Sequence, residues 1–417
     1  MRLRYPAVFL AAVLAGCGGS GGGGSATPPN PPSSAGTTMT VTFAGSAMPT
    51  AVAVAIGTGA FAQATISGGQ VTFVVPTGTS TFQLAYHCPP FLGMGTLDEE
   101  YVIDASTSDG TSPTLTCYAA PATTTESVTV NATALATATN AGAVGTFGYG
   151  TYVGSANGTA SGSFVNGTSD IAALAVDASN NLVGVKFVRA QTIPGAINGG
   201  NPIVFAASDA TTTSTMTVAG IPAGFGATPA YNISYQTANG TSFGVNRNTP
   251  TYAVVASANM AAGDAYAFES NDADGVTNQH IGATLYASAA GPVTVTLPTP
   301  WTYSGPAAAQ YPTFTFAYSG FSGTNAVTDH GAIFWQENPT TEAGIVVYAT
   351  PAYLGSSTTV NVPNLTSLTG FLASAASGAT VSVVSEVDSQ ASLSYLNQTQ
   401  GTGTEAYVQN DSSYIEP

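Results

Sequence analysis

An acidic run at 97–104 (LDEEYVID) is the densest group of titratable side chains in the sequence, with Asp98, Glu99, Glu100 and Asp104 close together. Glycoside hydrolysis needs two carboxylates that face one bond, usually beside an aromatic cleft. Consecutive side chains point to opposite sides of an extended backbone, so this run does not supply such a pair by itself. We therefore interpret it as a polar loop between two cysteines and assign no catalytic residue.

The segment 268–280 (FESNDADGVTNQH) is the best candidate for a metal site. Asp272 and Asp274 match part of a calcium loop, in which alternate carboxylates face a hard cation. The first and last positions of that loop lack carboxylates here, so Glu269 or Asp264 has to complete a non-standard set. The sequence thus suggests calcium at Glu269, Asp272 and Asp274, with a solvated acidic turn as the favoured alternative.

The histidines of the chain, His87, His280 and His330, are scattered and lack the spacing of zinc ligands. Asp329 next to His330 is reminiscent of a hydrolase triad. A polar loop before a buried strand at 332–335 explains this pair better. The sequence therefore indicates neither a zinc site nor a hydrolase centre at the histidines.

Aromatic side chains offer a different chemistry, because their flat faces stack on sugar rings. Trp301, Tyr303 and Phe321 lie near predicted module junctions or turns, and they are the candidate ligand-binding residues. Most aromatics in alternating segments are expected in the core instead. The wider set of aromatics considered for sugar binding comprises Tyr149, Tyr152, Tyr231, Tyr235, Tyr318 and Trp335.

Two cysteines of the chain body are predicted to form a disulfide. Cys88 ends an alternating segment in which Phe82, Leu84 and Tyr86 share its face, and Cys117 follows a similar segment. Two inward-facing cysteines in an exported protein usually pair. The alternative, a thiol nucleophile or metal ligand, lacks companion residues.

The N-terminal segment predicts export and lipid attachment. Arg2 and Arg4 precede an apolar run at 6–15 that is shorter than a membrane-spanning helix. The residues Leu-Ala-Gly-Cys ending at Cys17 resemble the bacterial lipobox, which implies a signal peptide at 1–16 and acylation of Cys17. Residues 17–36 are rich in Gly and Pro, as expected of a tether. The resemblance implies a lipid anchor, most simply in the outer membrane.

Charged residues make up only 6% of the chain, and 21 acidic residues face five basic ones. If the signal peptide is removed, the basic residues that remain are Lys186, Arg189 and Arg247. Nucleic acids and anionic lipid surfaces are bound by clustered Lys and Arg, so this balance excludes both as partners. Thr, Ser, Asn and Gln must solvate most of the surface.

Short alternating segments of Thr, Val and aromatic residues predict half-buried strands at 39–43, 231–235, 293–297 and 314–318. The segment 171–187 predicts a hairpin that turns at 179–181. Only 365–376 has the apolar spacing of a short helix.

An internal echo indicates repeated modules. MTVAGIPAGF (216–225) and VTVTLPTPW (293–301) each end an alternating strand at a proline, and TTVNVPNL (358–365) is a partial third copy. This pattern of alternating strands that end at prolines resembles the tandem immunoglobulin-like or fibronectin-type-III-like modules of bacterial surface lipoproteins. That resemblance implies adhesion, spacing or ligand presentation, and it carries over no functional residue.

We therefore expect an all-β chain of tandem β-sandwich modules. The predicted ranges are 37–122 with the disulfide, 123–226, 227–298, and 299–417 with a C-terminal extension. The expected function is that of a non-enzymatic, lipid-anchored envelope protein for adhesion, structure or assembly, whose partners are the membrane and envelope proteins. A polysaccharide-binding lipoprotein is the alternative, and an envelope hydrolase is a distant third.

Overall fold

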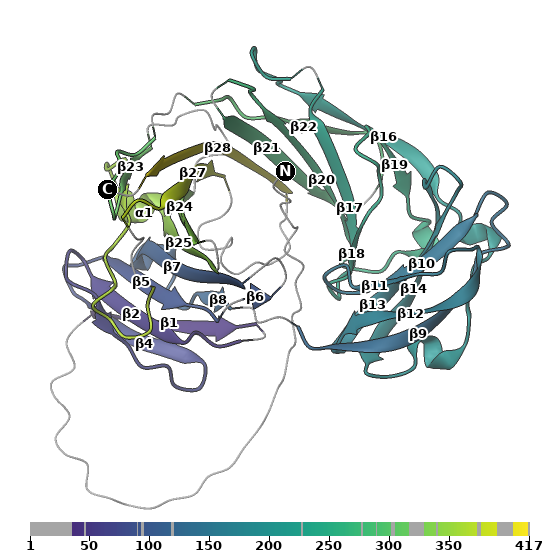
Figure 1. The fold of residues 1–417 in the computed structure, drawn as a ribbon, viewed down its shortest axis with the longest axis horizontal. Helices are drawn as coiled ribbons and strands as arrows, with labels where there is room; N and C mark the ends of the chain where they lie inside the picture. The colour runs from purple at the N-terminus through teal and green to yellow at the C-terminus, as the bar shows by residue number, and fades with distance from the viewer. Residues whose placement is uncertain are drawn as a thin grey trace, which may run out of the picture.

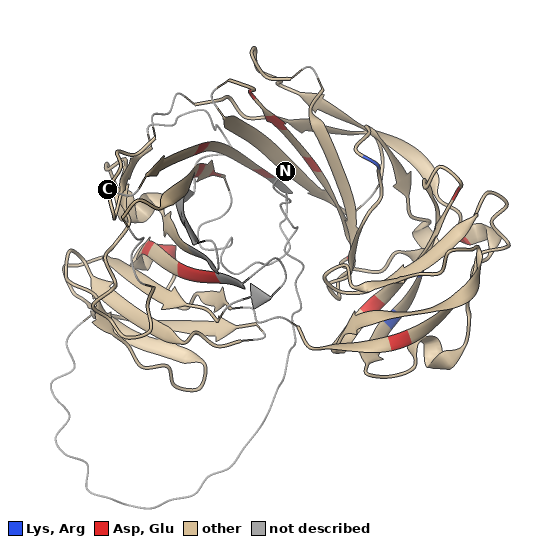
Figure 2. Cartoon of the chain, viewed as in Figure 1, with Lys and Arg blue, Asp and Glu red and all other residues tan. Residues whose placement is uncertain are grey.

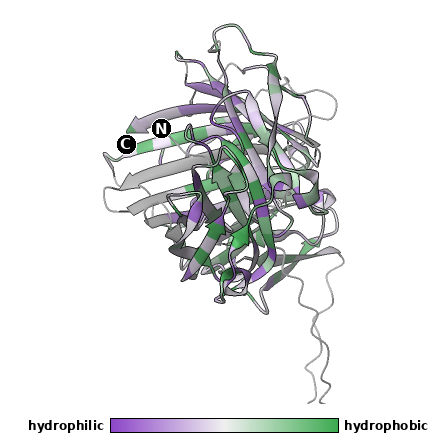
Figure 3. Cartoon of the chain, turned by 90° about the vertical axis from the view of Figure 1, so that its right-hand side faces the viewer, coloured by the Kyte–Doolittle hydropathy of each residue, from purple (hydrophilic) through white to green (hydrophobic). Residues whose placement is uncertain are grey.

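The fold is known from a computed structural model of the 417-residue chain, which describes residues 36–45, 47–89, 91–92, 96–117, 121–226, 228–276, 278–288, 290–301, 305–316, 329–338, 341–372, 377–389 and 403–415. Strands dominate these residues, and their only α-helix is α1 (Pro351–Leu354). Hydrophilic and hydrophobic residues alternate along the strands (Figure 3), as half-buried sheets require. The structure confirms the all-β class, with several packed sheets that fit tandem β-sandwich modules. No helix among the described residues has the length and hydropathy to span a membrane.

The N-terminal sandwich packs a small sheet against one end of a long sheet. Its core contains Met39, Val41, Phe82, Leu84 and Tyr86, all at most 1% exposed. The small sheet consists of β4 (Gln70–Pro76), β1 (Gly36–Ala44) and β8 (Thr114–Thr116). The facing strands are β2 (Ala51–Ile56), β5 (Thr81–His87) and β7 (Thr96–Ser106).

The long sheet runs as an arch through three of the four predicted ranges (Figure 1). All its pairings are antiparallel except that of β25 with β7, which is parallel. In spatial order it comprises β18 (Ser242–Gly244), β17 (Ala230–Gln236), β20 (Ala265–Ala273), β21 (Gln279–Ala287), β28 (Gly403–Ile415), β27 (Thr380–Asp388), β24 (Asp329–Asn338), β25 (Thr341–Ala349), β7, β5, β2 and β3 (Ala62–Gln63), with β6 (Phe91–Leu92) beside β7. Strands from the first, third and last predicted ranges therefore share one hydrogen-bonded sheet.

A second sandwich lies within the predicted range 123–226, around Phe164, Ile171 and Phe205. One sheet consists of β12 (Asn157–Val165), β9 (Thr123–Asn131) and β15 (Ile203–Val204). The other consists of β11 (Gly150–Tyr152), β10 (Asn140–Val144), β13 (Gly167–Val176) and β14 (Leu182–Ile193). The β13–β14 pair confirms the hairpin predicted at 171–187.

Two strands of the internal echo lie side by side. The parallel pairing of β16 (Thr212–Ala219) with β22 (Val293–Thr296) aligns Met216 with Val293, and β19 (Thr251–Val254) completes that sheet. A further small sheet joins β23 (Thr313–Thr315) to β26 (Thr359–Asn361). Both small sheets cover the long sheet through one apolar core. The predicted module boundaries remain predictions, and the sheet of β16, β19 and β22 combines strands from two of the predicted ranges.

Three predictions about local structure are wrong. Asp329 and His330 do not lie in a polar loop, because β24 begins at Asp329 and pairs both residues with β27. The run 97–104 is not a polar loop but lies in β7. Val102 and Ile103 are buried, so the acidic residues beside them belong to a strand of the core. The described part of the predicted helix, 365–372, forms turns instead. Its apolar residues still point inward, because Leu365 is 2% exposed and Leu368 and Phe371 pack on the main core.

Candidate functional site

The predicted disulfide is present. Cys88 and Cys117 are joined, with their Cα atoms 5.4 Å apart, and both are buried in the N-terminal sandwich. The bond links the end of β5 to the residue after β8, so it connects the two sheets of this sandwich. Three other predicted site residues, Cys17, Tyr303 and Phe321, lie outside the described residues.

Trp301 corrects the prediction of an exposed aromatic. Its side chain is 6% exposed, and its ring packs edge-on against Phe316 at 5.5 Å between centroids. Its backbone carbonyl accepts a hydrogen bond from Gln279. Trp301 therefore belongs to the core, which it shares with Phe316, the residue after β23.

The three candidate calcium ligands do not converge. Glu269 and Asp272 point to opposite faces of β20, and Glu269 accepts a hydrogen bond from Asn232 at 2.9 Å. Asp274 closes the following hairpin, where its carboxylate accepts from the Gln279 N–H at 3.1 Å. Among the described residues, no group of three or more His, Cys, Asp or Glu side chains is arranged to hold a metal ion.

A Gly-x-Ser-x-Gly pattern occurs at 240–244 (GTSFG), the pattern that forms the nucleophile elbow of many hydrolases. Such an elbow needs a sharp turn from a strand into a helix. Ser242 instead lies on β18 and pairs with Gln236 of β17, and it is 8% exposed. The pattern therefore has the wrong backbone context for a nucleophile.

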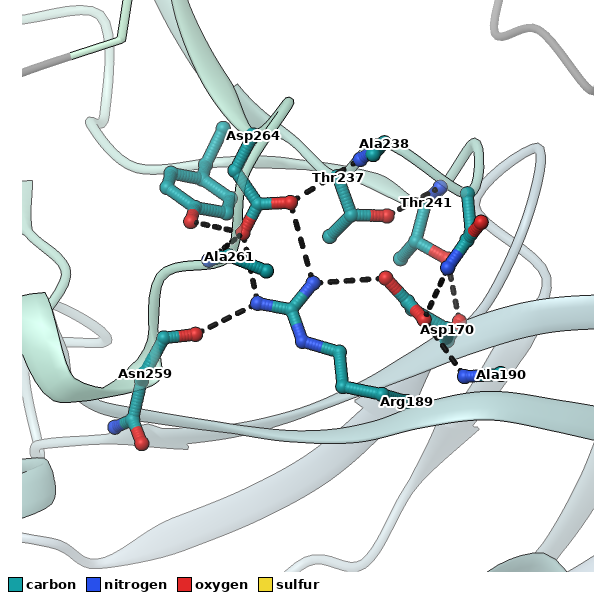
Figure 4. Close-up of polar contacts among 11 residues, drawn as sticks. Asp170, Arg189, Ala190, Thr237, Ala238, Thr241, Asn259, Ala261 and Asp264 are labelled. Atoms are coloured by element: carbon teal, nitrogen blue, oxygen red, sulfur yellow. Dashed lines mark hydrogen bonds and ion pairs between the residues drawn. The ribbon is translucent and has the colours of Figure 1, made fainter.

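The most extensive polar cluster centres on Arg189 of β14, and we call it the arginine junction (Figure 4). The Arg189 guanidinium donates to Asp170 at 2.8 Å and to both carboxylate oxygens of Asp264, at 3.2 and 2.7 Å. It also donates to the Asn259 carbonyl at 2.6 Å and lies 4.0 Å from the centre of the Phe187 ring. The side chains of Asp170 and Asp264 are 1% and 0% exposed.

Further donors satisfy the two carboxylates of the junction. Asp264 accepts from the Tyr235 hydroxyl at 2.6 Å and from the N–H groups of Ala238 and Ala261, at 3.1 and 2.9 Å. Asp170 accepts from the Ala190 N–H at 2.8 Å and from the Asn239 amide at 3.0 Å. Such complete hydrogen bonding is what a buried ion pair needs in order to be stable.

The surroundings keep the junction charged. Burial by itself raises the pKa of Asp170, but the Ala190 N–H, Asn239 and Arg189 together hold that pKa below its ordinary value. Burial by itself lowers the pKa of Arg189, whereas Asp264 and Asp170 raise it above its ordinary value. Both partners are therefore ionised at neutral pH.

Lys and Arg are sparse along the chain (Figure 2), and two of the three basic residues outside Arg2 and Arg4, Arg189 and Arg247, make contacts between the predicted ranges 123–226 and 227–298. Lys186 donates to Asp209 at 3.2 Å, and Asp209 also accepts from the Asn259 amide at 3.0 Å. Arg247 donates to the carbonyl of Ser179 across the same boundary. Arg189 and Arg247 thus link the predicted ranges 123–226 and 227–298 directly, and Lys186 does so only through Asp209.

The acidic residues of β7 form a second cluster. Its buried carboxyl groups have fewer hydrogen-bond donors than those of the arginine junction. Glu100 is 0% exposed and Asp104 is 2% exposed, and both share a strand face with the buried Val102. One Glu100 oxygen accepts from the Leu372 N–H at 3.0 Å, while the other has no hydrogen-bond partner in the described structure. Asp104 accepts from the Gln83 amide at 2.7 Å.

Burial raises the pKa of both acids. It raises the pKa of Glu100 to about 7, against opposing effects of the Leu372 N–H and the charge of His87. It raises the pKa of Asp104 to about 7 as well, although the Gln83 hydrogen bond opposes it. Carboxyl groups with raised pKa values are typical of general acids. Glu100 has no exposed surface, however, so a substrate cannot reach it in this conformation.

Two exposed aromatic side chains occur on one hairpin of the second sandwich. Tyr152 is 60% exposed and Phe147 is 36% exposed, and they are the large aromatics among the strongly exposed hydrophobic residues of the described chain. Phe147 and Gly148 both have positive φ, at 57° and 72°, which is the geometry of a tight hairpin turn. That turn carries the Phe147 side chain outward.

The sequence analysis missed the arginine junction and the burial of Glu100. A usable signal for the junction was the scarcity of basic residues, because two of them, Lys186 and Arg189, stand three positions apart at the end of the predicted hairpin 171–187 and just beyond it. No comparable signal marked Glu100, since its burial depends on Leu372, which is distant in sequence.

Comparison with known proteins gives no family. The sequence matches no known protein family and no curated protein. Among solved structures, the chain has a likeness to the Bacillus anthracis TIE protein, at 8% identity and a TM-score of 0.16, over 63% of this chain and 50% of that one. The chain thus spans half the length of that protein, and a TM-score this low supports no argument about fold or role.

Proposed function

We propose that this chain is a lipid-anchored scaffold at the bacterial cell envelope, which holds a rigid β-sheet body off the membrane for adhesion or assembly and performs no catalysis. The anchor and tether in this proposal rest on the lipobox-like residues ending at Cys17 and on the Gly/Pro-rich segment 17–36. The comparison with immunoglobulin-like and fibronectin-type-III-like surface lipoproteins belongs to the proposal in the same way.

The arginine junction is the observation that carries the scaffold proposal. Arg189 of one predicted module holds Asp264 and the Asn259 carbonyl of the next, with donor–acceptor distances of 2.6 to 3.2 Å. A module pair linked only by a flexible connector does not need such a buried ion network. The network therefore favours a body that keeps one shape.

The long sheet supports rigidity in the rest of the molecule. β7 and β25 pair along eight aligned residue pairs, from Leu97–Glu342 to Asp104–Ala349, although they lie far apart in sequence. Separating these segments requires breaking a central ladder of backbone hydrogen bonds. A stiff body suits the presentation of a surface at a fixed distance from a membrane.

Fatty-acid labelling and adhesion measurements test the proposal. We expect the full chain in a lipoprotein-exporting bacterium to incorporate a labelled fatty acid and to fractionate with membranes, and Cys17→Ser to abolish both. Cells that display the wild-type chain should bind a surface or an envelope protein that cells with Cys17→Ser do not bind. Unchanged labelling and fractionation of Cys17→Ser would exclude the anchor, and a turnover activity in the purified chain would exclude a purely structural role.

Binding of polysaccharide is the second candidate function, and the exposed Tyr152 and Phe147 favour it. Exposed aromatic faces are typical of sugar-binding surfaces. In native gels that contain cell-wall or plant polysaccharides, we expect selective retardation that Tyr152→Ala removes. Ile221→Ala is the matched control, because Ile221 is also an exposed large apolar residue, at 38% exposure, on another loop. Retardation that persists in Tyr152→Ala would exclude this site.

A further inference from the structure

Residues 365–372 cross the face of β7 that carries Glu100, and we call this segment the strap. It turns on itself through a hydrogen bond from the Leu368 N–H to the Leu365 carbonyl at 2.9 Å. Leu365 is buried, and Leu368 and Phe371 pack against the main core. The strap therefore closes over part of the apolar interior.

Three side chains of the underlying sheet hold the backbone of the strap. Glu100 accepts from the Leu372 N–H at 3.0 Å. A ring nitrogen of His87, on β5, lies 2.6 Å from the Gly370 carbonyl oxygen, and Gln63 donates to the Thr369 carbonyl at 3.3 Å. One of these three side chains, Glu100, is a fully buried carboxyl group, so proton binding at Glu100 acts directly on a contact of the strap.

The groups that face Glu100 come from several elements. On β7 itself, Asp98 and Asp104 share its face, and on β5 the second ring nitrogen of His87 lies 2.6 Å from Asp98. Tyr353 of α1 lies close enough to Asp104 for that charge to act on it. The aligned residue on β25 is Ile345, which does not titrate, and the strap itself contains no titratable side chain.

His87 and Glu100 hold the strap in different ways. One ring nitrogen of His87 lies 2.6 Å from an Asp98 carboxylate oxygen, and the other lies near the Gly370 carbonyl and the Thr50 hydroxyl. Loss of a proton from Glu100 creates a charge that has a single donor, Leu372, and no exposed surface. Ionisation of Glu100 therefore weakens the closed strap, because the strap keeps the new charge out of water.

We infer that 365–372 is a pH-sensitive strap, which the protonated Glu100 keeps closed over β7 and which lifts from the sheet when Glu100 ionises. Lifting the strap exposes the Glu100 carboxylate to water, and hydration removes the free-energy cost of burying the new charge. Lifting also uncovers the apolar surface beneath Leu365 and Leu368, so opening changes which surface the scaffold presents. The pKa of Glu100, raised by burial to about 7, is consistent with this device.

Hydrogen–deuterium exchange of the full chain tests the strap. The protection factors of amides 366–372, corrected for the intrinsic effect of pH, should fall about 100-fold between pH 5 and 7 and level off above, because one proton is released on opening. Glu100→Gln should reduce this change to less than about tenfold, since glutamine is neutral at every pH. A change of about 100-fold that persists in Glu100→Gln would overturn the proposal.

Two control variants separate the strap from a general loss of charge. Glu126 also accepts a single backbone N–H, from Gly195 at 2.9 Å, but it lies in the second sandwich, so Glu126→Gln should leave the strap's pH dependence intact. Asp104→Asn, which has no contact with the strap in the described structure, should leave most of it intact. Equal effects of Asp104→Asn and Glu100→Gln would overturn the role of Glu100.

If Glu100→Gln does not fold, hydrogen–deuterium exchange of the wild-type chain at several pH values still tests the proposal. The amides of β21 (Gln279–Ala287) serve as an internal reference, since this strand is paired on both sides, with β20 and β28, in the long sheet. Loss of protection confined to the strap supports the proposal. Equal loss in the strap and in β21 would show global unfolding instead, and unchanged protection in both would show that no strap opens.

Discussion

The arginine junction and the acidic face of β7 bury the same kind of side chain and treat it in opposite ways. Asp170 and Asp264 meet a guanidinium and several N–H donors, whereas one oxygen of Glu100 has no partner in the described structure. The pKa of Asp170 is accordingly lowered, whereas that of Glu100 is raised to about 7. The number of donors, not burial alone, decides whether a buried acid is charged.

The two regions therefore depend on pH in opposite directions. Asp170 has a lowered pKa in the folded protein, so its contribution to stability is present above its ordinary pKa and is lost as the pH falls through the lowered value. Glu100 and Asp104 have raised pKa values, so their contribution is fully present at low pH and is lost as the pH rises through about 7. A falling pH therefore destabilises the arginine junction, whereas a pH that rises through about 7 destabilises the closed strap.

Arg189→Met should have the largest effect, because it leaves two buried carboxylates without a cation. Breaking a buried ion pair by removing one partner costs about 3 to 5 kcal/mol of unfolding free energy. Urea unfolding at pH 7 measures this loss. A loss below about 1 kcal/mol would mean that the Arg189 contacts contribute no more to stability than exposed ion pairs do.

Glu100→Gln should make the free energy of unfolding less dependent on pH. Raising the pKa of this fully buried group from 4.5 to about 7 corresponds to about 3 kcal/mol, which the wild type loses as the pH rises and the variant keeps. Urea unfolding at pH 5, 6, 7 and 8 measures the difference between the two slopes. Parallel slopes in wild type and variant would contradict the assignment, and Glu126→Gln provides the control.

Asp170→Asn should act in the opposite direction along the pH scale. At pH 7 it removes the charge that pairs with Arg189, and we expect a loss of about 2 kcal/mol, as for hydrogen bonds to charged groups. Below the lowered pKa of Asp170 the wild-type carboxyl is itself neutral, so the difference between wild type and variant should shrink toward acid. A difference that grows toward acid would contradict this account.

Arg247→Met should have the smallest effect. Arg247 is exposed and donates to a single backbone carbonyl, that of Ser179. Contacts of exposed charged side chains contribute about 0 to 1 kcal/mol, so urea unfolding should change by less than that. A loss comparable to that of Arg189→Met would mean that the junction extends further than Arg189 and its partners.

The sequence predicted local β structure well. The alternation of Thr with Val and aromatic residues located β1, β17 and β22, and the shared phase of Cys88 and Cys117 predicted their disulfide. These features depend on neighbours within a few residues, where the period of two decides which face is buried. The parallel pairing of β7 with β25 joins segments about 245 residues apart in the chain, so no local sequence pattern predicts it.

The candidate sites were less predictable for the same reason. Trp301 stands beside prolines and looked exposed, but Phe316 covers its ring. Asp264 looked available to a cation, but Arg189, distant in sequence, neutralises it. Glu100 looked solvated in an acidic run, until Val102 and the strap placed it in the core. In each case a partner far along the chain decides the environment of the residue.

A distance measurement across the arginine junction tests the scaffold proposal most directly. Spin labels at Ala134→Cys and Val276→Cys, both exposed positions, report on the ranges 123–226 and 227–298, with Cys17→Ser leaving no other thiol outside the Cys88–Cys117 disulfide. We predict one narrow distance distribution at pH 7, which broadens with Arg189→Met and stays narrow with Arg247→Met. A broad distribution in the chain without junction substitutions would contradict the rigid scaffold.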